Sequence, residues 1–203
     1  MRVVRSIVDL PADVETTVVE RRFGDATFFK SDLTRDGRRI ITYQFDDPPQ
    51  LLDEPGMPTW DAVAPYFLVA QKTTWAALAE AYWRGWRERV TLTDALRAKA
   101  AELTADKPPA DAARALYEFV LRDVRDNNVS IWARDPLPKP PAETLAETRG
   151  NIVDRTALLA ELARAAGLDT TPCFVSPAFW FEPLDQAPLL QSASVLLLRF
   201  DLP

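Results

Sequence analysis

The spacing of apolar residues changes at about residue 70, and this change constrains the fold of the 203-residue chain more than any other feature. Before it, short β-branched and aromatic runs are separated by turn signals, and Asp36-Gly37 predicts a hairpin between Phe28–Leu33 and Ile40–Phe45. After it, apolar residues recur every three or four positions, as in amphipathic helices. Five prolines between residues 46 and 66 interrupt any regular strand pairing. We therefore predict an α+β protein, with a β-rich, partial-sandwich domain over residues 1–70 and an α+β domain over residues 71–203.

Local signals divide the second domain into helices and strands. Thr91 and Asp94 have the spacing of a capping box and predict the start of a helix. Asn151 is a good N-cap for a later helix, and Asp154 stands at its third position, where it can bond back to the cap. The predicted elements are helices starting at 74, at 91 and at 109, a short helix over 142–148, a long helix over 152–166 closed by Gly167, and strands over 170–175 and 194–200.

The charge and the scarcity of two residue types exclude several classes of function. The formal net charge is −6, which argues against a nucleic acid or an anionic membrane surface as partner. The chain contains no histidine, so it has no imidazole base and no imidazole metal ligand. One cysteine cannot form an internal disulfide or a thiolate zinc site. We therefore expect no cofactor, no metal site and no membrane-inserted segment.

The single cysteine and three of the tryptophans are expected to be packing residues. Cys173 lies in a predicted buried strand, without a cationic neighbour in sequence, and is expected to be a packing residue. Trp75, Trp83 and Trp86 share one face of the first predicted helix and are expected to pack. Trp132 stands in a loop-like segment and is a better candidate for contact with a ligand.

The segment PAETLAETRGNIVDRTALLAELARAAG, over residues 141–167, resembles the core of the transglutaminase-like superfamily. The resemblance is closest to a bacterial subgroup in which a β-sandwich domain of unknown function precedes that core. It extends to Trp75, to the helix near 107–126 and to the first half of the chain. It implies a papain-type α+β fold, with a catalytic Cys at the start of the long helix, a His on the next strand and an Asp on the strand after that.

When the chain is aligned with this family, the catalytic Cys and His that the resemblance implies are missing. Gly150 and Asp154 match the family's Gly-Asp-Cys-Lys-Asp-Lys run, but Ile152 stands in place of the Cys. Ser194 falls in the place of the His. We therefore predict no catalytic residue, and a relic cleft formed by Trp132, Gly150, Asn151, Ile152, Asp154 and Ser194.

These observations lead to a principal hypothesis about function and two alternatives. The first is a pseudoenzyme, a catalytically inactive transglutaminase-like domain that binds a peptide or protein within a larger protein. The second is one part of an active transglutaminase or cysteine-peptidase-like enzyme, completed by residues outside this chain. The third is a structural spacer. Both ends of the chain look like cuts in a longer, multidomain protein, and the resemblance favours an extracytoplasmic location.

Overall fold

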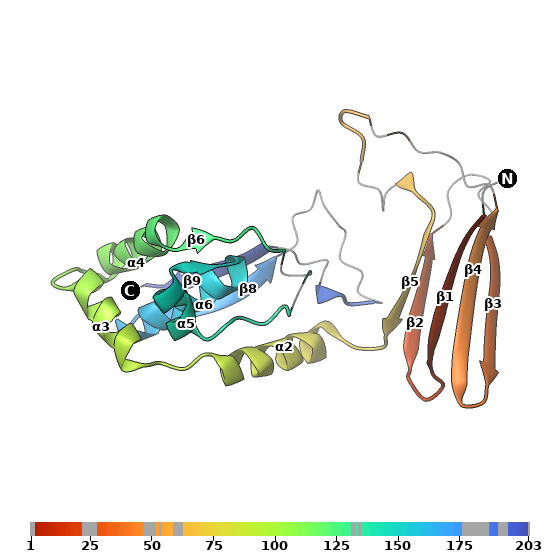
Figure 1. The fold of residues 1–203 in the computed structure, drawn as a ribbon, viewed down its shortest axis with the longest axis horizontal. Helices are drawn as coiled ribbons and strands as arrows, with labels where there is room; N and C mark the ends of the chain where they lie inside the picture. The colour runs from red at the N-terminus through yellow and green to blue at the C-terminus, as the bar shows by residue number, and fades with distance from the viewer. Residues whose placement is uncertain are drawn as a thin grey trace. The chain divides into compact units, whose positions relative to one another are not determined.

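The computed structural model describes residues 3–21, 28–46, 52, 54–58, 63–130, 133, 135–175, 187–190 and 195–202. It contains helices together with antiparallel sheets, which confirms the predicted α+β class (Figure 1). The chain divides into two compact units. Unit 1 comprises Met1–Leu78 and Pro177–Ser192, and unit 2 comprises Ala79–Ser176 and Ala193–Pro203.

Unit 1 contains two small antiparallel sheets. In the first, β4 (Arg38–Asp46) lies between β1 (Val3–Pro11) and β3 (Phe28–Arg35). In the second, β2 (Thr16–Arg21) pairs with β5 (Tyr66–Gln71). These strands contain the β-branched and aromatic runs that the sequence places before residue 70.

The predicted hairpin joins β3 to β4 through a two-residue loop. Arg35 pairs with Arg38, so only Asp36 and Gly37 lie between the strands. Their φ angles are 52° and 73°, as a two-residue turn with both central residues left-handed requires. The hairpin prediction is confirmed.

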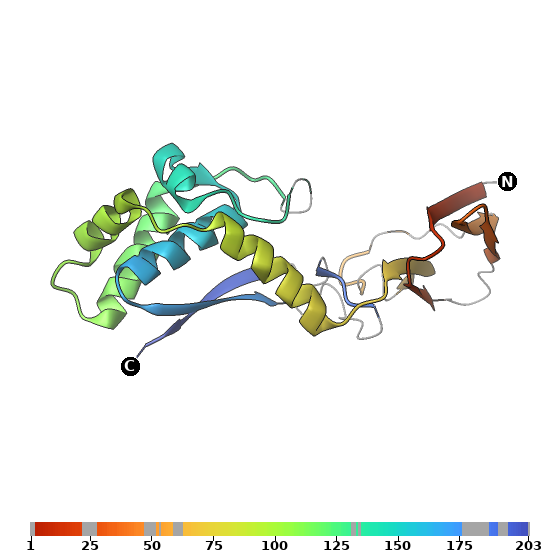
Figure 2. The ribbon, with the colours of Figure 1, turned by 90° about the horizontal axis from the view of Figure 1, so that it is seen from below.

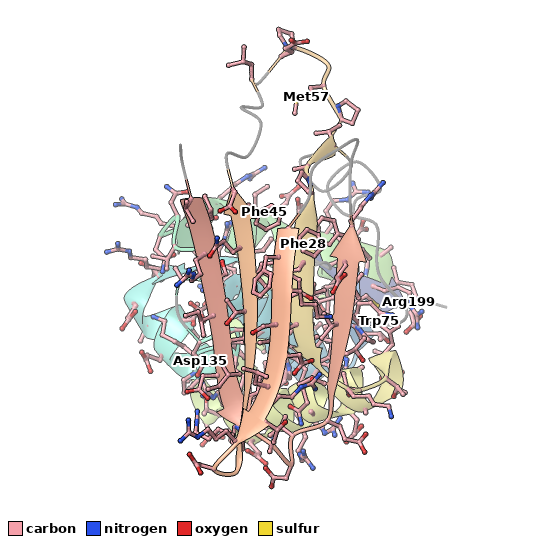
Figure 3. The ribbon with its side chains drawn as sticks, turned by 90° about the vertical axis from the view of Figure 1, so that its right-hand side faces the viewer. Phe28, Phe45, Met57, Trp75, Asp135 and Arg199 are labelled. Carbon is pink, nitrogen blue, oxygen red and sulfur yellow. The ribbon has the colours of Figure 1, made fainter. Side chains whose placement is uncertain are left out.

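Side chains of the two sheets meet at Tyr43 of β4. Its ring stacks on Phe67 of β5 with centroids 3.9 Å apart, and its hydroxyl donates to Glu20 of β2 at 2.5 Å. On the first sheet, the ring of Phe28 lies 5.2 Å from that of Phe45 and 5.3 Å from that of Tyr43; Figure 3 shows Phe28 and Phe45 on neighbouring strands. Tyr43 therefore links three strands through one buried side chain.

Unit 2 is built mainly from helices. These are α2 (Trp75–Arg89, whose first four residues belong to unit 1), α3 (Asp94–Thr104), α4 (Pro109–Asp123), α5 (Pro141–Glu147) and α6 (Ile152–Ala165). Its strands are the short parallel pair β6 (Arg125–Asp126) and β7 (Arg149–Gly150), and the antiparallel pair β8 (Asp169–Val175) and β9 (Val195–Asp201). Helix α6 packs on α3, α4, α5 and on both strands of the β8–β9 ribbon, and the helices lie on one side of that ribbon (Figure 2).

Two predicted helix ends are wrong by a few residues. Helix α3 begins at Asp94, and its N-cap is Thr93, whose Oγ1 accepts from the Leu96 amide at 3.4 Å. Thr91 is therefore not the cap, although its spacing to Asp94 fits a capping box. Helix α4 ends at Asp123, a few residues before the end of the helix expected near 107–126, because the following residues pair with β7 as β6.

The core of unit 2 lies where α3, α4 and α6 meet. Leu96, Leu116, Leu158 and Leu162 are fully buried there, one or two from each helix. Among the described residues, no helix has the length and apolar character needed to cross a membrane.

Candidate functional site

The start of α6 is held by a complete capping box. Asn151 Oδ1 accepts from the amides of Val153 and Asp154 at 2.9 and 3.0 Å, and Asp154 Oδ2 accepts from the Asn151 amide at 3.1 Å. The cap therefore has the form expected from the sequence. Asp154 is 3% exposed and its Oδ1 also accepts from the Lys139 amide at 2.8 Å. Its carboxylate thus joins the helix start to the proline-rich segment before α5.

Gly150 is required at this corner because it has no side chain. A Cβ at position 150 would lie 2.6 Å from the Asp154 Cβ and 3.2 Å from the Thr144 Cγ2. The Gly150 carbonyl also accepts from the Asn127 amide at 3.2 Å. The corner therefore depends on close backbone approach, which only glycine allows here.

Ile152 is the first residue of α6, and it faces outward. Its side chain is 42% exposed, whereas the next residue, Val153, is 1% exposed. An aliphatic side chain here can neither donate a proton nor act as a nucleophile. The N-terminus of α6 is thus accessible to solvent at position 152, and the side chain exposed there is purely aliphatic.

Arg155 closes the neighbouring helix. Its Nη2 donates to the carbonyl oxygens of Val120 and Leu121 at 3.2 and 3.5 Å, and its Nη1 lies 3.5 Å from Asp126 Oδ2. The last carbonyls of a helix carry partial negative charge and lack partners within the helix. Arg155 therefore caps the C-terminal end of α4.

A polar pocket of about 250 Å³ opens beside this corner, lined by Arg89, Asn127, Val129, Asp135, Leu137, Lys139, Asn151 and Asp154. Arg89 Nη2 and Asp135 Oδ2 form an ion pair at 2.5 Å. The pKa of Asp135 is lowered, first by the hydrogen bond that its carboxylate accepts from the Leu137 amide and then by Arg89. Asn151, which is 8% exposed, uses its Oδ1 for the helix cap, so its Nδ2 takes no part in the cap.

Tyr82 holds the wall of the pocket to α2. Its hydroxyl donates to the Pro136 carbonyl at 3.0 Å, and burial raises the pKa of the phenol well above its usual range. The phenol therefore remains protonated and acts as a hydrogen-bond donor rather than as a base. The proline-rich segment is fixed on one side by Tyr82 and on the other by Asp154.

The structure brings together four of the six predicted cleft residues: Gly150, Asn151 and Asp154 around the cap, and Ile152 on its outer side. Trp132 and Ser194 lie outside the described residues.

The topology places β9's first residue at the same end of unit 2 as Ile152. After α6, about 21 Å long, β8 runs back over about 23 Å, and its last residue, Val175, pairs with Val195. The role of Ser194 stays a prediction.

Cys173 is on β8, away from any helix start. Its thiol lies 3.6 Å from the Thr171 carbonyl, to which it donates, and the residue is half-buried. It pairs in register with Leu197 of β9. A cysteine in the middle of a strand lacks the helix dipole that stabilises a reactive thiolate.

The sequence did not indicate Arg89, Asn127, Asp135 and Lys139 as pocket residues. They come from α2, from the segment after β6 and from the proline-rich segment, and only the tertiary structure brings them to Asn151. One local signal existed: Asp135 is two residues before Leu137 and accepts from its amide, as in an Asx turn.

Comparison with known proteins supports the fold only. No family model matches the chain, and no curated protein matches it. Among solved structures, the crystal structure of a putative protease from Parabacteroides distasonis is similar, with a TM-score of 0.80 and 13% sequence identity. The match covers 99% of this chain and 38% of that protein, so the chain spans well under half of its length. The chain thus has the fold of one part of this putative protease.

Proposed function

We propose that this chain is a non-catalytic module on a transglutaminase-like scaffold, and that it binds peptide at the start of α6. The observation that carries the proposal is Ile152, exposed at the first position of α6, where the resembling family has its nucleophile. The cap around it is intact, so the scaffold is kept while the reactive group is absent.

The Cys–His pair that the resembling family uses for acyl transfer cannot be assembled from the residues of this chain. Acyl transfer needs a thiolate or an activated hydroxyl and a base within hydrogen-bond reach. The sequence has no histidine, and its one thiol, Cys173, is on a strand rather than at a helix start. The carboxylate closest to position 152 in the chain, Asp154, is already bonded to the amides of Asn151 and Lys139.

The pocket offers groups that suit a peptide backbone. Asn151 and Asn127 both line the pocket, and the Oδ1 of each accepts from a backbone amide, so the Nδ2 of each is the group left for a ligand. Such amides bind peptide carbonyl oxygens. Because Arg89 and Asp135 neutralise one another, a neutral backbone is a better match than a strongly charged ligand.

The binding test uses Ac-Ala-Gly-Ala-NH2, a short neutral peptide, and two-dimensional NMR of the full 203-residue chain. We expect the side-chain NH2 signals of Asn151 and Asn127 to shift as peptide is added. Asn151→Ser keeps an N-cap oxygen but removes Nδ2, and it should weaken binding. Gln71→Ser, which removes an exposed amide from β5, should leave binding unchanged. No shift at either asparagine, or equal binding by Asn151→Ser, would contradict the proposal and favour the spacer.

The absence of catalysis is tested separately. The pure chain is incubated with dimethylcasein and a biotinylated amine, and also with labelled casein. We expect neither amine incorporation nor cleavage above the buffer background. Turnover that iodoacetamide abolishes would show that Cys173, the only thiol, acts as a nucleophile. It would contradict the proposal that the chain is non-catalytic.

A second candidate function rests on the length comparison. The chain matches only 38% of the putative protease, so a longer protein could bring catalytic groups to this scaffold from outside these residues. Ile152 would still supply no sulfur, and both nucleophile and base would have to come from elsewhere. Amine incorporation or cleavage by the longer protein, but not by this chain, would favour this candidate.

A further inference from the structure

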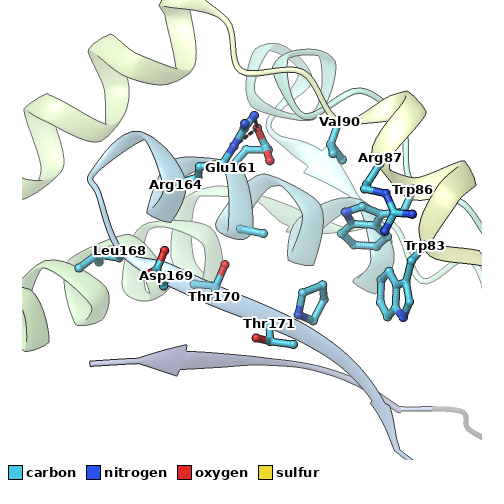
Figure 4. Close-up of a pocket in the computed structure, with 12 residues that line it drawn as sticks. Trp83, Trp86, Arg87, Val90, Glu161, Arg164, Leu168, Asp169, Thr170 and Thr171 are labelled. Atoms are coloured by element: carbon cyan, nitrogen blue, oxygen red, sulfur yellow. Dashed lines mark hydrogen bonds and ion pairs between the residues drawn. The ribbon is translucent and has the colours of Figure 1, made fainter. Parts of the chain in front are cut away.

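A second pocket, larger than the first, lies between α2, α6 and β8 in unit 2 and has a volume of about 570 Å³ (Figure 4). Trp83 and Trp86 line it from α2, but Trp86 is only 5% exposed. Its charged side chains are two of each sign: Arg87, Arg164, Glu161 and Asp169. We therefore assign no ligand to this groove. The outer edge of β1, in unit 1, is the surface that indicates a partner.

Strand β1 lies at an edge of its sheet. Within the described residues it pairs with β4 on one side and with no strand on the other. Its register with β4 is unbroken over the 9 residues Val3–Pro11, so no bulge bends the edge away from a partner. The strand contains no lysine, a residue that often blocks strand addition, and Ile7 at its centre is 60% exposed. β1 therefore has the form of a strand to which another strand can be added.

The hydrogen bonds of the sheet decide which backbone groups of β1 point outward. One residue beyond the strand, the Ala12 amide donates to the Gly37 carbonyl at 2.9 Å. Bonded and non-bonded pairs alternate along antiparallel strands, so the even-numbered residues of β1 bond to β4. The backbone N–H and C=O groups of Arg5, Ile7 and Asp9 therefore point to the open edge. In the described part of the chain, nothing bonds to them.

The residues of this edge are complementary to themselves. When a second copy of β1 lies antiparallel to the first with Ile7 opposite Ile7, Arg5 stands opposite Asp9 in both directions. On the other face of the sheet, the same register sets Val4 opposite Leu10. Sliding one copy by two residues is the smallest shift that keeps the outward groups together, and it sets Ile7 opposite a charged residue. Charge thus selects one register.

Both charged side chains are placed to take part in such a pairing. Arg5 donates through Nε and Nη2 to the neutral Gln44 Oε1 at 3.0 and 2.6 Å, and no carboxylate of the described residues pairs with it. Asp9 Oδ1 accepts from Arg38 at 2.7 Å, but the Asp9 side chain is 48% exposed. A second copy would give Arg5 a carboxylate and Asp9 a further cation. Each exposed pair contributes little, but two-fold symmetry makes every such contact twice.

We propose that two copies of this chain associate through β1, in the antiparallel register centred on Ile7, so that two three-stranded sheets become one continuous sheet. About six ladder hydrogen bonds would form, at Ile7 and at the two Arg5–Asp9 pairs. The ladder stops at Pro11, which has no N–H and whose carbonyl accepts from the Val14 amide at 3.2 Å. One strand from each copy makes a small interface, so we expect a dissociation constant on the order of 10 µM. The proposal is independent of peptide binding at the start of α6.

The opposite edge of the sheet, β3, gains less from a second copy. Antiparallel pairing of two β3 strands about their centre would set Lys30 opposite Asp32. These side chains are already used within the chain, since Lys30 pairs with Glu20 and Asp32 with Arg39, each at 2.7 Å. They also lie on the face of the sheet that turns towards β2 and β5. β3 therefore serves as the internal control for β1.

Sedimentation equilibrium of the full 203-residue chain tests for association. The protein is examined from about 1 to about 200 µM, a range that brackets the expected dissociation constant. Salt at about 0.15 M screens the net charge of −6 on each copy. We expect a reversible equilibrium between monomer and dimer. A monomer over the whole range, or assembly that continues beyond the dimer, would overturn the proposal.

Charge reversal tests the register. Arg5→Asp and Asp9→Arg each set like charges opposite one another at both pairs, and each should weaken association about tenfold. An equal mixture of the two folded variants has opposite charges at both pairs and should associate as the native chain does. Arg35→Asp, at the exposed end of β3, makes the same change in net charge and should leave association unchanged. Association that survives Arg5→Asp, or that does not return in the mixture, would contradict the proposal.

A disulfide tests the two-fold axis directly, in a chain whose Cys173 is replaced by serine. Ile7→Cys would place two thiols in a bonded pair with Cα atoms about 5.5 Å apart, within the reach of a disulfide. We expect mild oxidation to give a covalent dimer. Ser31→Cys is the matched control, because Ser31 of β3 pairs with Thr42 just as Ile7 does. A covalent dimer from Ser31→Cys and none from Ile7→Cys would assign the contact to β3 and overturn the proposal.

Discussion

The two units differ in how their structures are stabilised. In unit 2, a dozen buried apolar side chains from α3, α4, α6 and the adjoining residues form one continuous core. Among the described residues of unit 1, the large side chains that are fully buried are Ile41 and Tyr43 of β4, while Ile7, Phe29 and Leu33 remain about 60% exposed on the sheet. Unit 2 thus depends on packing, and unit 1 on contacts between particular strands. Both pockets lie in the unit with the larger core, which can hold side chains in fixed positions.

Removing a core side chain from unit 2 should have the largest effect. Leu158→Ala deletes a fully buried side chain from the centre of α6 and should lower the free energy of unfolding by about 3 kcal/mol. Denaturant unfolding followed by amide exchange measures the change in α3, α4 and α6 separately from the strands of unit 1. Leu121→Ala, at a half-exposed position on α4, is the control and should cost little. A loss of similar size in both variants would mean that burial does not distinguish them.

Disrupting the capping box of α6 should have the second-largest effect on stability. Asp154→Ala removes the acceptor for the Asn151 and Lys139 amides and leaves both near the buried helix start. We expect a loss of about 2 kcal/mol in the free energy of unfolding. Asp123→Ala, which truncates an exposed carboxylate at the end of α4, should change it by less than about 0.5 kcal/mol. Equal stability of the two variants would show that Asp154 is not needed for the corner.

Removal of a single hydroxyl group tests how the two sheets of unit 1 are joined. Tyr43→Phe keeps the ring stacked on Phe67 but removes the hydrogen bond to Glu20, and should cost about 1 kcal/mol. Glu20 retains its ion pair with Lys30 at 2.7 Å, so the carboxylate is not left alone. Thermal unfolding of the two proteins gives the difference. An unchanged melting temperature would mean that the stack, without the hydrogen bond, joins the two sheets.

The smallest effect is expected from pH at the first pocket. The pKa of Asp135 is lowered in the folded chain, so its contribution to stability is present above the ordinary carboxyl pKa. It should be lost as pH falls through the lowered folded pKa, below the ordinary value of 3.8. Exchange of the Leu137 amide should therefore speed up in this acid range. The rise should be absent in Asp135→Asn, which has no proton to gain; a rise in both would assign the effect to another group.

Local signals in the sequence predicted the parts of the fold that depend on neighbours in the chain. Asp36-Gly37 predicts its turn because both residues tolerate positive φ, and the structure has 52° and 73° there. Asn151 and Asp154 predict the start of α6 because their spacing allows both bonds of the capping box. Thr91 has the same capping-box spacing to Asp94, but Thr93 is the residue that caps α3. The spacing alone therefore did not locate this helix start.

Contacts between distant segments could not be predicted in this way. The Lys139 amide that completes Asp154, and the carbonyls of α4 that receive Arg155, lie 15 and 35 residues from their partners. Trp83 and Asp169 line one groove only because β8 turns back along α6 towards α2. Nothing in their local sequence distinguishes these residues from ordinary surface or packing residues.

The outward position of Ile152 has a practical consequence. Because the capping bonds are made by Asn151 and Asp154, exchange of residue 152 leaves the helix entrance intact. A cysteine introduced there, in a chain whose native Cys173 is replaced by serine, would give one accessible attachment point for a fluorophore or a spin label. Such a label would report occupancy of the adjacent pocket directly, without disturbing the framework that surrounds it.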